Sequence, residues 1–208
     1  MRTAFAILLF FTSRLCAQTD SIPYSKDFNF KEGLYLSYAD FRNNDPIPKT
    51  KIQTNYDKNA LDFFKQETAK TEIKYLDASG VEQTVRTNKL WGYCSNNGIY
   101  INYGRDFSKI MVVGSICHFT ATVETYVGGY DHYTGAPANI RSYQLEQFVI
   151  DSRTGKVGSF TLVNMEALLK QDDALYNEFM KLSKRKRKDM MFVYLRKFNE
   201  KHPLYFKS

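Results

Sequence analysis

Three turn motifs between residues 72 and 162 constrain the fold more than any other feature of this chain. They lie at residues 77–80 (Asp-Ala-Ser-Gly), 96–98 (Asn-Asn-Gly) and 152–155 (Ser-Arg-Thr-Gly), and each separates two segments of strand composition. Glycine readily adopts the positive φ that tight hairpin turns require. The sequence therefore predicts consecutive antiparallel hairpins, the pattern of a β-meander.

The three predicted hairpins span residues 72–86, 90–103 and 142–162, and residues 109–127 supply one long strand or two shorter ones bent at Gly114. Ile99, Ile101 and Tyr103 alternate with Tyr100 and Asn102, which is the period of a strand with two different faces.

Two weaker elements precede these hairpins. Residues 33–38 have strand composition, and Asp57 is expected to cap a short helix through Phe64.

From residue 164 onward the apolar periodicity changes from that of strands to that of helices. Asn164, Asp172 or Asp173, and Ser183 are predicted to cap successive helices. Pro203 ends the last of these. Its apolar stripe consists of Met190, Met191, Tyr194, Leu195 and Phe198. This order predicts an α+β fold, in which an antiparallel sheet is followed by two to three C-terminal helices packed on it.

The first seventeen residues have the pattern of a secretory signal peptide. Arg2 provides the charged start, residues 4–11 form an apolar run, and Ala17 is the small residue at the cleavage position. Cleavage would leave residues 18–208, which we expect to form a single α+β domain. The sequence thus predicts export to the periplasm or the extracellular space.

Cys16 raises the alternative of a lipid-anchored protein, because lipid attached at the cleavage point would hold the product on a membrane. Arg14 and Leu15 stand where such a motif has small residues, which favours export without an anchor. No later stretch reaches the roughly 18 to 20 apolar residues of a membrane helix, so no transmembrane segment is expected after the signal peptide.

The basic character of the chain belongs to its C-terminal end. The formal net charge is +7, yet residues 181–208 hold ten Lys or Arg against Asp189 and Glu200. Export makes nucleic acid an unexpected partner and favours lipopolysaccharide, anionic phospholipid or acidic polysaccharide. A solvated helix turn is the alternative interpretation. The predicted contact residues are Lys184, Arg185, Lys186, Arg187 and Lys188.

A tyrosine- and glycine-rich segment, predicted as a loop over residues 128–139, is the other candidate surface. Tyrosine offers a flat apolar face with a polar tip, which suits stacking on sugars or contact with a protein partner. Tyrosines that simply pack beside a turn are the alternative. The predicted ligand-binding residues are Tyr126, Tyr130, Asp131, His132 and Tyr133.

The chain offers little that points to catalysis. Cys94 and Cys117 are expected to be free and buried, although a disulfide is the alternative in an oxidising compartment. Cys117 and His118 are adjacent on a predicted strand, so their side chains point to opposite faces and cannot form a nucleophile and base.

No metal or cofactor motif is present in the sequence. Glu124 and Glu146 are the carboxylates that a hydrolase of envelope or dietary polymer could use.

Five segments of the chain resemble uncharacterised exported proteins of Gram-negative bacteria. They are residues 33–36, 40–44, 90–94, 99–101 and 194–203. The resemblance implies export and a shared fold, and it brings no activity, ligand or catalytic residue. The sequence therefore predicts an exported, non-catalytic binding or envelope-associated protein whose partner is an envelope component, a polysaccharide or another protein.

Overall fold

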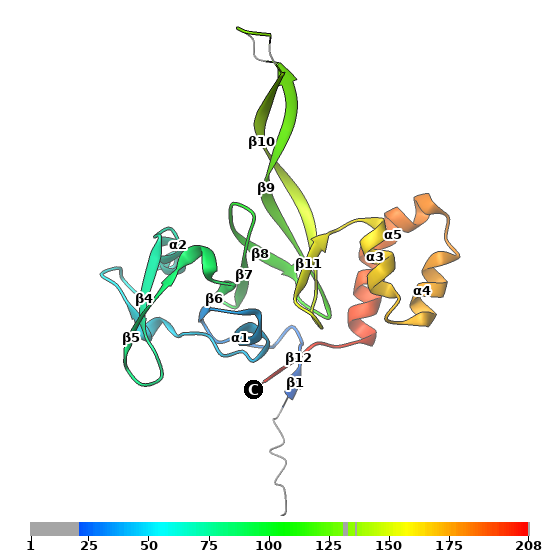
Figure 1. Ribbon diagram of the computed structural model, residues 1–208. Helices are drawn as coiled ribbons and strands as arrows, with labels where there is room; N and C mark the ends of the chain where they lie inside the picture. The colour runs from blue at the N-terminus through cyan, green and yellow to red at the C-terminus, as the bar shows by residue number, and fades with distance from the viewer. Residues whose placement is uncertain (1–20, 131–132, 136, 208) are drawn as a thin grey trace, which may run out of the picture.

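A seven-stranded antiparallel sheet forms the centre of the molecule (Figure 1). The structure is a computed structural model that describes residues 21–130, 133–135 and 137–207. From one edge to the other the strands are β2 (Gly33–Tyr35), β6 (Gly92–Ser95), β7 (Gly98–Tyr103), β8 (Asp106–Val112), β9 (Ile116–Tyr130), β10 (Pro137–Asp151) and β11 (Lys156–Ser159). Strands β6 to β11 follow one another in both sequence and space, so the predicted meander is confirmed for the second and third hairpins.

The turns that the sequence predicted join these strands. Asn96 and Asn97 both have positive φ, at 48° and 57°, as a two-residue turn between β6 and β7 requires. Gly155 has a φ of 74° in the turn between β10 and β11. Residues 109–127 form parts of two strands that separate around Gly114, one of the two predicted outcomes.

Gly114 allows a helix to approach the sheet closely. A Cβ at this position would lie 2.4 Å from the side-chain amide of Asn199. That amide bonds to both backbone groups of Ile116, accepting from its N–H at 2.7 Å and donating to its carbonyl at 2.9 Å. The absence of a side chain at Gly114 therefore lets Asn199 pair with the start of β9.

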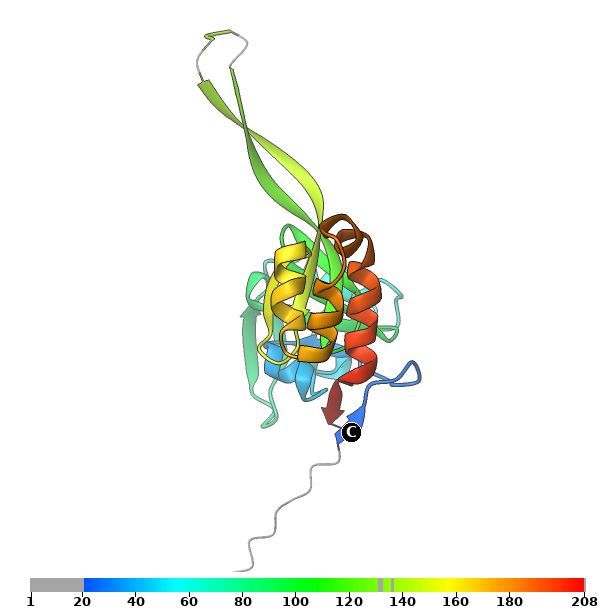
Figure 2. The same ribbon diagram turned by 90° about the vertical axis from the view of Figure 1, so that its right-hand side faces the viewer.

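The expectation of a loop over residues 128–139 is wrong at both ends of that range. Strand β9 continues to Tyr130 and β10 begins at Pro137, which pairs with Tyr130 in register. The cross-strand hydrogen bonds continue through Gly128 and Gly129, whose low strand propensity is outweighed by the ladder on either side. The strand pairing thus reaches Tyr130 and Pro137, and Figures 1 and 2 show the outer part of the hairpin projecting from the rest of the chain.

One face of the sheet is covered by segments from the two ends of the described chain. Strands β1 (Ser21–Pro23) and β12 (Tyr205–Lys207) pair with each other, and helix α1 (Tyr38–Arg42) lies beside them. Phe206 of β12 lies 5.0 Å, between ring centroids, from Phe30 of the segment between β1 and β2, and 5.3 Å from Phe41 of α1. This apolar cluster also includes Cys94 and Cys117 from the sheet.

Helices α3 (Leu162–Leu169), α4 (Asp173–Met180) and α5 (Lys184–Lys201) cover the opposite face at the β9–β11 end (Figure 2). Their buried side chains pack on Ile116 and Val149 of the sheet. This confirms the predicted α+β class with C-terminal helices. Among the described residues, no helix is long and apolar enough to span a bilayer.

Two of the predicted helix caps are confirmed and one is displaced. The side chain of Asp172 accepts from Leu175 N–H at 3.1 Å and that of Ser183 accepts from Lys186 N–H at 3.3 Å. Helix α3 instead begins at Leu162, capped by Thr161. Asn164 lies inside α3, and its side-chain amide donates to Ser159 O at the end of β11, at 2.8 Å. This hydrogen bond holds the Asn164 side chain away from the capping position.

A smaller three-stranded sheet covers the same face at the β2–β7 end. It consists of β3 (Ile52–Gln53), β4 (Glu72–Leu76) and β5 (Glu82–Arg86), with helix α2 (Phe63–Thr68) and the 3-10 helices η1 (Lys49–Lys51) and η2 (Thr87–Lys89). The predicted 72–86 hairpin is confirmed as β4 and β5. The helix that Asp57 was expected to cap begins six residues later, at Phe63. The Asp57 carboxylate instead accepts from Asn59 N–H and stabilises a turn.

Candidate functional site

The outer half of the β9–β10 hairpin, which we call the arm, is a two-stranded ribbon of residues 123–130 and 137–146. Strand β8 pairs with β9 only as far as Phe119, with one further bond from Arg105 N–H to Thr122 O. Strand β11 pairs with β10 only from Phe148 onward. Beyond these points, among the residues that the structure describes, the two strands pair only with each other.

One face of the arm carries its large exposed side chains. The register pairs Glu124 with Tyr143 and Thr122 with Leu145. Side chains alternate along a strand, so β9 residues with even numbers share a face with β10 residues with odd numbers. The resulting aromatic stripe consists of Tyr126, Tyr130, Tyr143 and Leu145, which are 62%, 71%, 45% and 72% exposed. Thr125, Ser142 and Gln144 lie on the opposite face.

A hydrogen bond, an ion pair and a cation–π contact hold side chains in the inner part of this stripe in place. Tyr126 Oη donates to Glu124 Oε1 at 2.6 Å, and Arg141 Nε lies 3.1 Å from the same oxygen. The hydrogen bond to this carboxylate raises the pKa of Tyr126, because ionising the phenol would place two negative charges together. The Arg105 guanidinium lies 4.7 Å from the Tyr143 ring centroid, within cation–π range.

The predicted ligand-binding residues divide into two groups. Tyr126 and Tyr130 lie on the stripe, on strand β9 and not in a loop. Tyr133 is 99% exposed in the turn, while Asp131 and His132 lie outside the described residues. The sequence did not single out Tyr143 and Leu145, because they come from the second strand of a hairpin whose register was not predicted.

The five basic residues at the start of α5 do not share one environment. Lys184, Arg185, Lys186 and Lys188 are exposed. Arg187 is half-buried, forms an ion pair with Glu166 of α3 and contacts the Met180 sulfur. Its guanidinium therefore has a structural partner in the helical layer.

A second charged cluster joins α4 to the end of α5. Asp172, the N-cap of α4, accepts from Lys201 Nζ at 2.9 Å and contacts His202 Nε2 at 2.7 Å. Together with the Leu175 N–H, these donors hold the pKa of Asp172 well below its usual range. His202 is the C-cap of α5, and its partner at the start of α4 was not predictable from the spacing.

The thiols and His118 occupy structural positions. Cys94 and Cys117 are free and buried, as predicted. They lie on β6 and β9 with two strands between them, more than the single strand predicted, and thus about 14 Å apart at the usual strand spacing. Burial raises the pKa of Cys94 to about 12 and raises that of Cys117.

His118 lies on the face opposite Cys117, as the alternation predicted. It hydrogen-bonds Gln147 at 3.0 Å and packs against Phe160 and Phe192. Burial lowers its pKa, since the charged imidazolium would lose its hydration.

The two candidate carboxylates do not converge on one substrate. Glu124 pairs with Tyr143 and Glu146 pairs with Ala121, so the two glutamates lie on opposite faces of the arm. No group of three or more His, Cys, Asp or Glu side chains suited to a metal ion occurs within the described residues.

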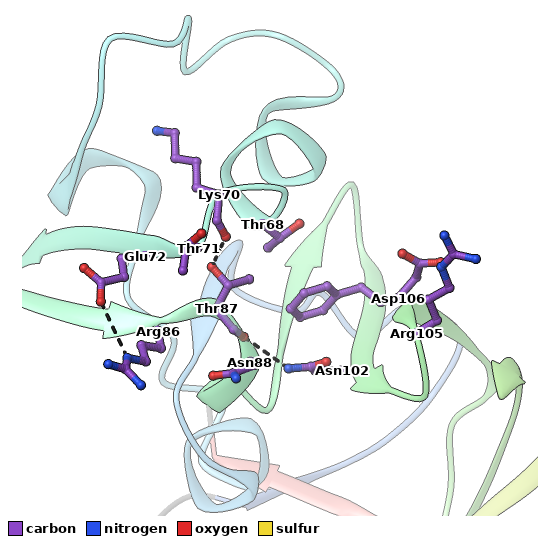
Figure 3. Close-up of a pocket in the computed structure, with 11 residues that line it drawn as sticks. Thr68, Lys70, Thr71, Glu72, Arg86, Thr87, Asn88, Asn102, Arg105 and Asp106 are labelled. Carbon is purple, nitrogen blue, oxygen red and sulfur yellow. Dashed lines mark hydrogen bonds and ion pairs between the residues drawn. The ribbon is translucent and has the colours of Figure 1, made fainter. Parts of the chain in front are cut away.

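A polar pocket of about 410 Å³ lies between the small sheet and the β7–β8 turn (Figure 3). Thr87 and Asn102 lie near its centre, the Glu72–Arg86 pair lies at one side, and Arg105 and Asp106 lie at the other. Sequence analysis missed this pocket because its residues are ordinary polar side chains from segments far apart in the chain.

Comparison with known protein families assigns this chain to one family. The chain belongs to a family of unknown function (DUF6563). The match covers residues 33–202, from the first strand of the large sheet to the end of α5. No curated protein and no solved structure matches the chain. The family membership agrees with the uncharacterised nature of the proteins that the sequence resembles and gives no activity.

Proposed function

We propose that this protein is exported and works by binding a protein partner through the aromatic stripe on its arm. The observation that carries the proposal is the placement of Tyr126, Tyr130, Tyr143 and Leu145 on one face of a projecting ribbon. Export is supported by the signal-peptide pattern of residues 1–17.

The stripe has the composition of a protein interface. Tyrosine buries a large apolar area at a small cost in side-chain entropy, and it is enriched among the residues that dominate binding energy. A ribbon that projects from the chain has no inner layer on which such side chains could pack. A partner surface would supply that layer, whereas solvent leaves the rings and Leu145 exposed.

Site-specific photo-crosslinking in the native host tests the partner. A photoreactive residue at Tyr130 is expected to give a discrete adduct with another protein, and the combined Tyr126→Ala and Leu145→Ala changes are expected to abolish it. The matched control carries the photoreactive residue at Gln144, on the opposite face of the same ribbon. Equal adducts at both positions, or none at Tyr130, would refute the proposal.

The export part of the proposal has its own test. Mass spectrometry of the protein isolated from its host should find Gln18 at the N-terminus, in the periplasm or the medium. A chain that retains Met1 to Ala17 and fractionates with the cytoplasm would contradict export without bearing on the arm.

Contact with an anionic surface is a second candidate function. Four cations, Lys184, Arg185, Lys186 and Lys188, are exposed at the start of α5, and Val193 and Phe192 are partly exposed farther along it. Vesicles containing anionic phospholipid should bind the protein at low salt and release it at high salt. Neutralising these four residues should remove the binding, and salt-independent association would refute this function.

A further inference from the structure

We propose that the pocket between the small sheet and the β7–β8 turn binds a neutral saccharide unit. Its volume of about 410 Å³ lies within the roughly 300–1,000 Å³ of typical small-molecule sites. The pocket lies on the body of the protein, so this inference does not depend on the proposed role of the arm.

The centre of the pocket presents fixed hydrogen-bonding groups. The Asn102 Nδ2 donates to Thr87 O at 3.1 Å and to Leu90 O at 3.0 Å, which uses both of its hydrogens and leaves Oδ1 as an acceptor. The buried Thr87 hydroxyl donates to Lys70 O at 2.5 Å and keeps its lone pairs. Both side chains are therefore held in place before a ligand arrives.

Further polar groups line the pocket without a partner of their own. Within the described part of the chain, no hydrogen bond or ion pair engages the side chains of Asn88, Thr71 and Asp106. Asn88 supplies both donors and an acceptor, Thr71 a hydroxyl, and Asp106 a carboxylate. Phe107 adds an aromatic ring, which packs against Tyr93 at 5.3 Å between centroids. Neutral hydroxyls with an apolar ring face match this set of groups.

The cations around the pocket are already engaged, which argues against a phosphate or carboxylate ligand. Lys70 Nζ lies 2.7 Å from Glu67 Oε1, and Figure 3 shows its side chain pointing away from Thr87. Arg86 is paired with Glu72 at 3.6 Å, and Arg105 lies over the Tyr143 ring. A charged ligand would have to compete with these contacts, whereas a neutral one would not.

The test is an NMR titration of residues 18–208 with glucose, galactose, mannose and N-acetylglucosamine, and with glucuronate and inorganic phosphate as anionic comparators. At least one neutral saccharide is expected to shift the side-chain amide signals of Asn88 and Asn102 in a saturable way. Asn88→Ala should weaken that binding about tenfold, the cost of one lost hydrogen bond. Asp106→Asn is a second variant with the same expected direction.

Asn177→Ala is the matched control, because Asn177 is an exposed asparagine on α4, far from the pocket lining. Its affinity for the saccharide should equal that of the unchanged chain. The inference is overturned if no neutral saccharide shifts the two amides, if only phosphate or glucuronate does, or if Asn88→Ala and Asp106→Asn bind as well as the control.

Discussion

The inner and outer halves of the β9–β10 hairpin share one continuous strand pairing but lie in opposite surroundings. In the inner half, Phe119 and Phe148 are buried between the sheet and its covering layer. In the outer half, Tyr126 and Leu145 continue the same ladder into solvent. Strand pairing therefore sets the direction of each side chain, and the presence of a second layer sets whether it is buried.

This contrast suggests different roles for the two halves. The inner half belongs to the core, where close packing makes each side chain important for stability. An isolated two-stranded ribbon is at best marginally stable by itself. The arm is therefore expected to contribute little to stability and to be available for binding.

The largest expected effect distinguishes the two halves directly. Phe119→Ala should lower the free energy of unfolding by about 3–5 kcal/mol, because it empties a fully buried site. Tyr126→Ala should change it by less than about 1 kcal/mol, since the ring is exposed. Urea denaturation of both variants measures the difference. Similar losses would show that the arm is part of the core.

The next largest expected effect on stability comes from substituting one of two glycines with similar backbone conformations. Gly104 and Gly135 have similar φ values of 74° and 66°, yet a Cβ at Gly104 would lie 2.5 Å from Thr122 O, whereas one at Gly135 meets no described atom within 4 Å. The positive φ is expected to cost an alanine about 1–2 kcal/mol at either position, and Gly104→Ala is expected to cost at least about 1 kcal/mol more because its Cβ would clash with the Thr122 carbonyl oxygen. Thermal unfolding of the two variants checks this order. A reversed order would contradict the packing of the β7–β8 turn against β9.

The effect of Asp172→Asn is expected to depend on pH. The native contacts lower the pKa of Asp172, so its stabilising contribution is complete above the usual carboxyl pKa of about 3.9 and is lost as the pH falls below it. Denaturation at several pH values should show the variant less stable at neutral pH, with the difference shrinking in acid. A difference that grows in acid would mean that the Lys201 and His202 contacts do not stabilise the carboxylate.

The smallest expected effect comes from shortening the arm. Replacing residues 127–140 by Asn-Gly should keep the free energy of unfolding within about 1 kcal/mol, because the removed ladder has no second layer. The free energy of unfolding of this variant should depend on pH in the same way as that of the full chain. Global unfolding of the shortened variant would show that the fold needs the arm, and would contradict its proposed role as a separate binding element.

Local chemistry explains what could be predicted. Asn96 and Asn97 gave a hairpin turn, and Asp172 and Ser183 gave helix caps, because each of these signals acts within a few residues. The alternation of Cys117 and His118 was predictable for the same reason. The prediction for Asn164 was wrong, because its side chain can bond either to the helix that follows it or to the strand that precedes it. In the structure it bonds to Ser159 of the preceding strand.

The candidate sites depended on contacts between distant segments. Arg187 belongs to a charged run, yet its partner Glu166 lies on another helix. The pocket brings Asn88 of η2 together with Asn102 and Asp106 of the large sheet. Spacing along the chain carries no information about such pairs when the side chains are common polar types.

The sequence alone determined the order of the predicted hairpins and C-terminal helices, the turns at residues 77–80, 96–98 and 152–155, and the alternation of side chains along a strand, because hydrogen-bonded turns and side-chain alternation are local. Only the tertiary structure decided that the tyrosine-rich segment is a projecting arm and that a polar pocket forms beside η2. Burial and pocket formation depend on which layers cover the sheet. That covering is set by packing between residues far apart in the chain.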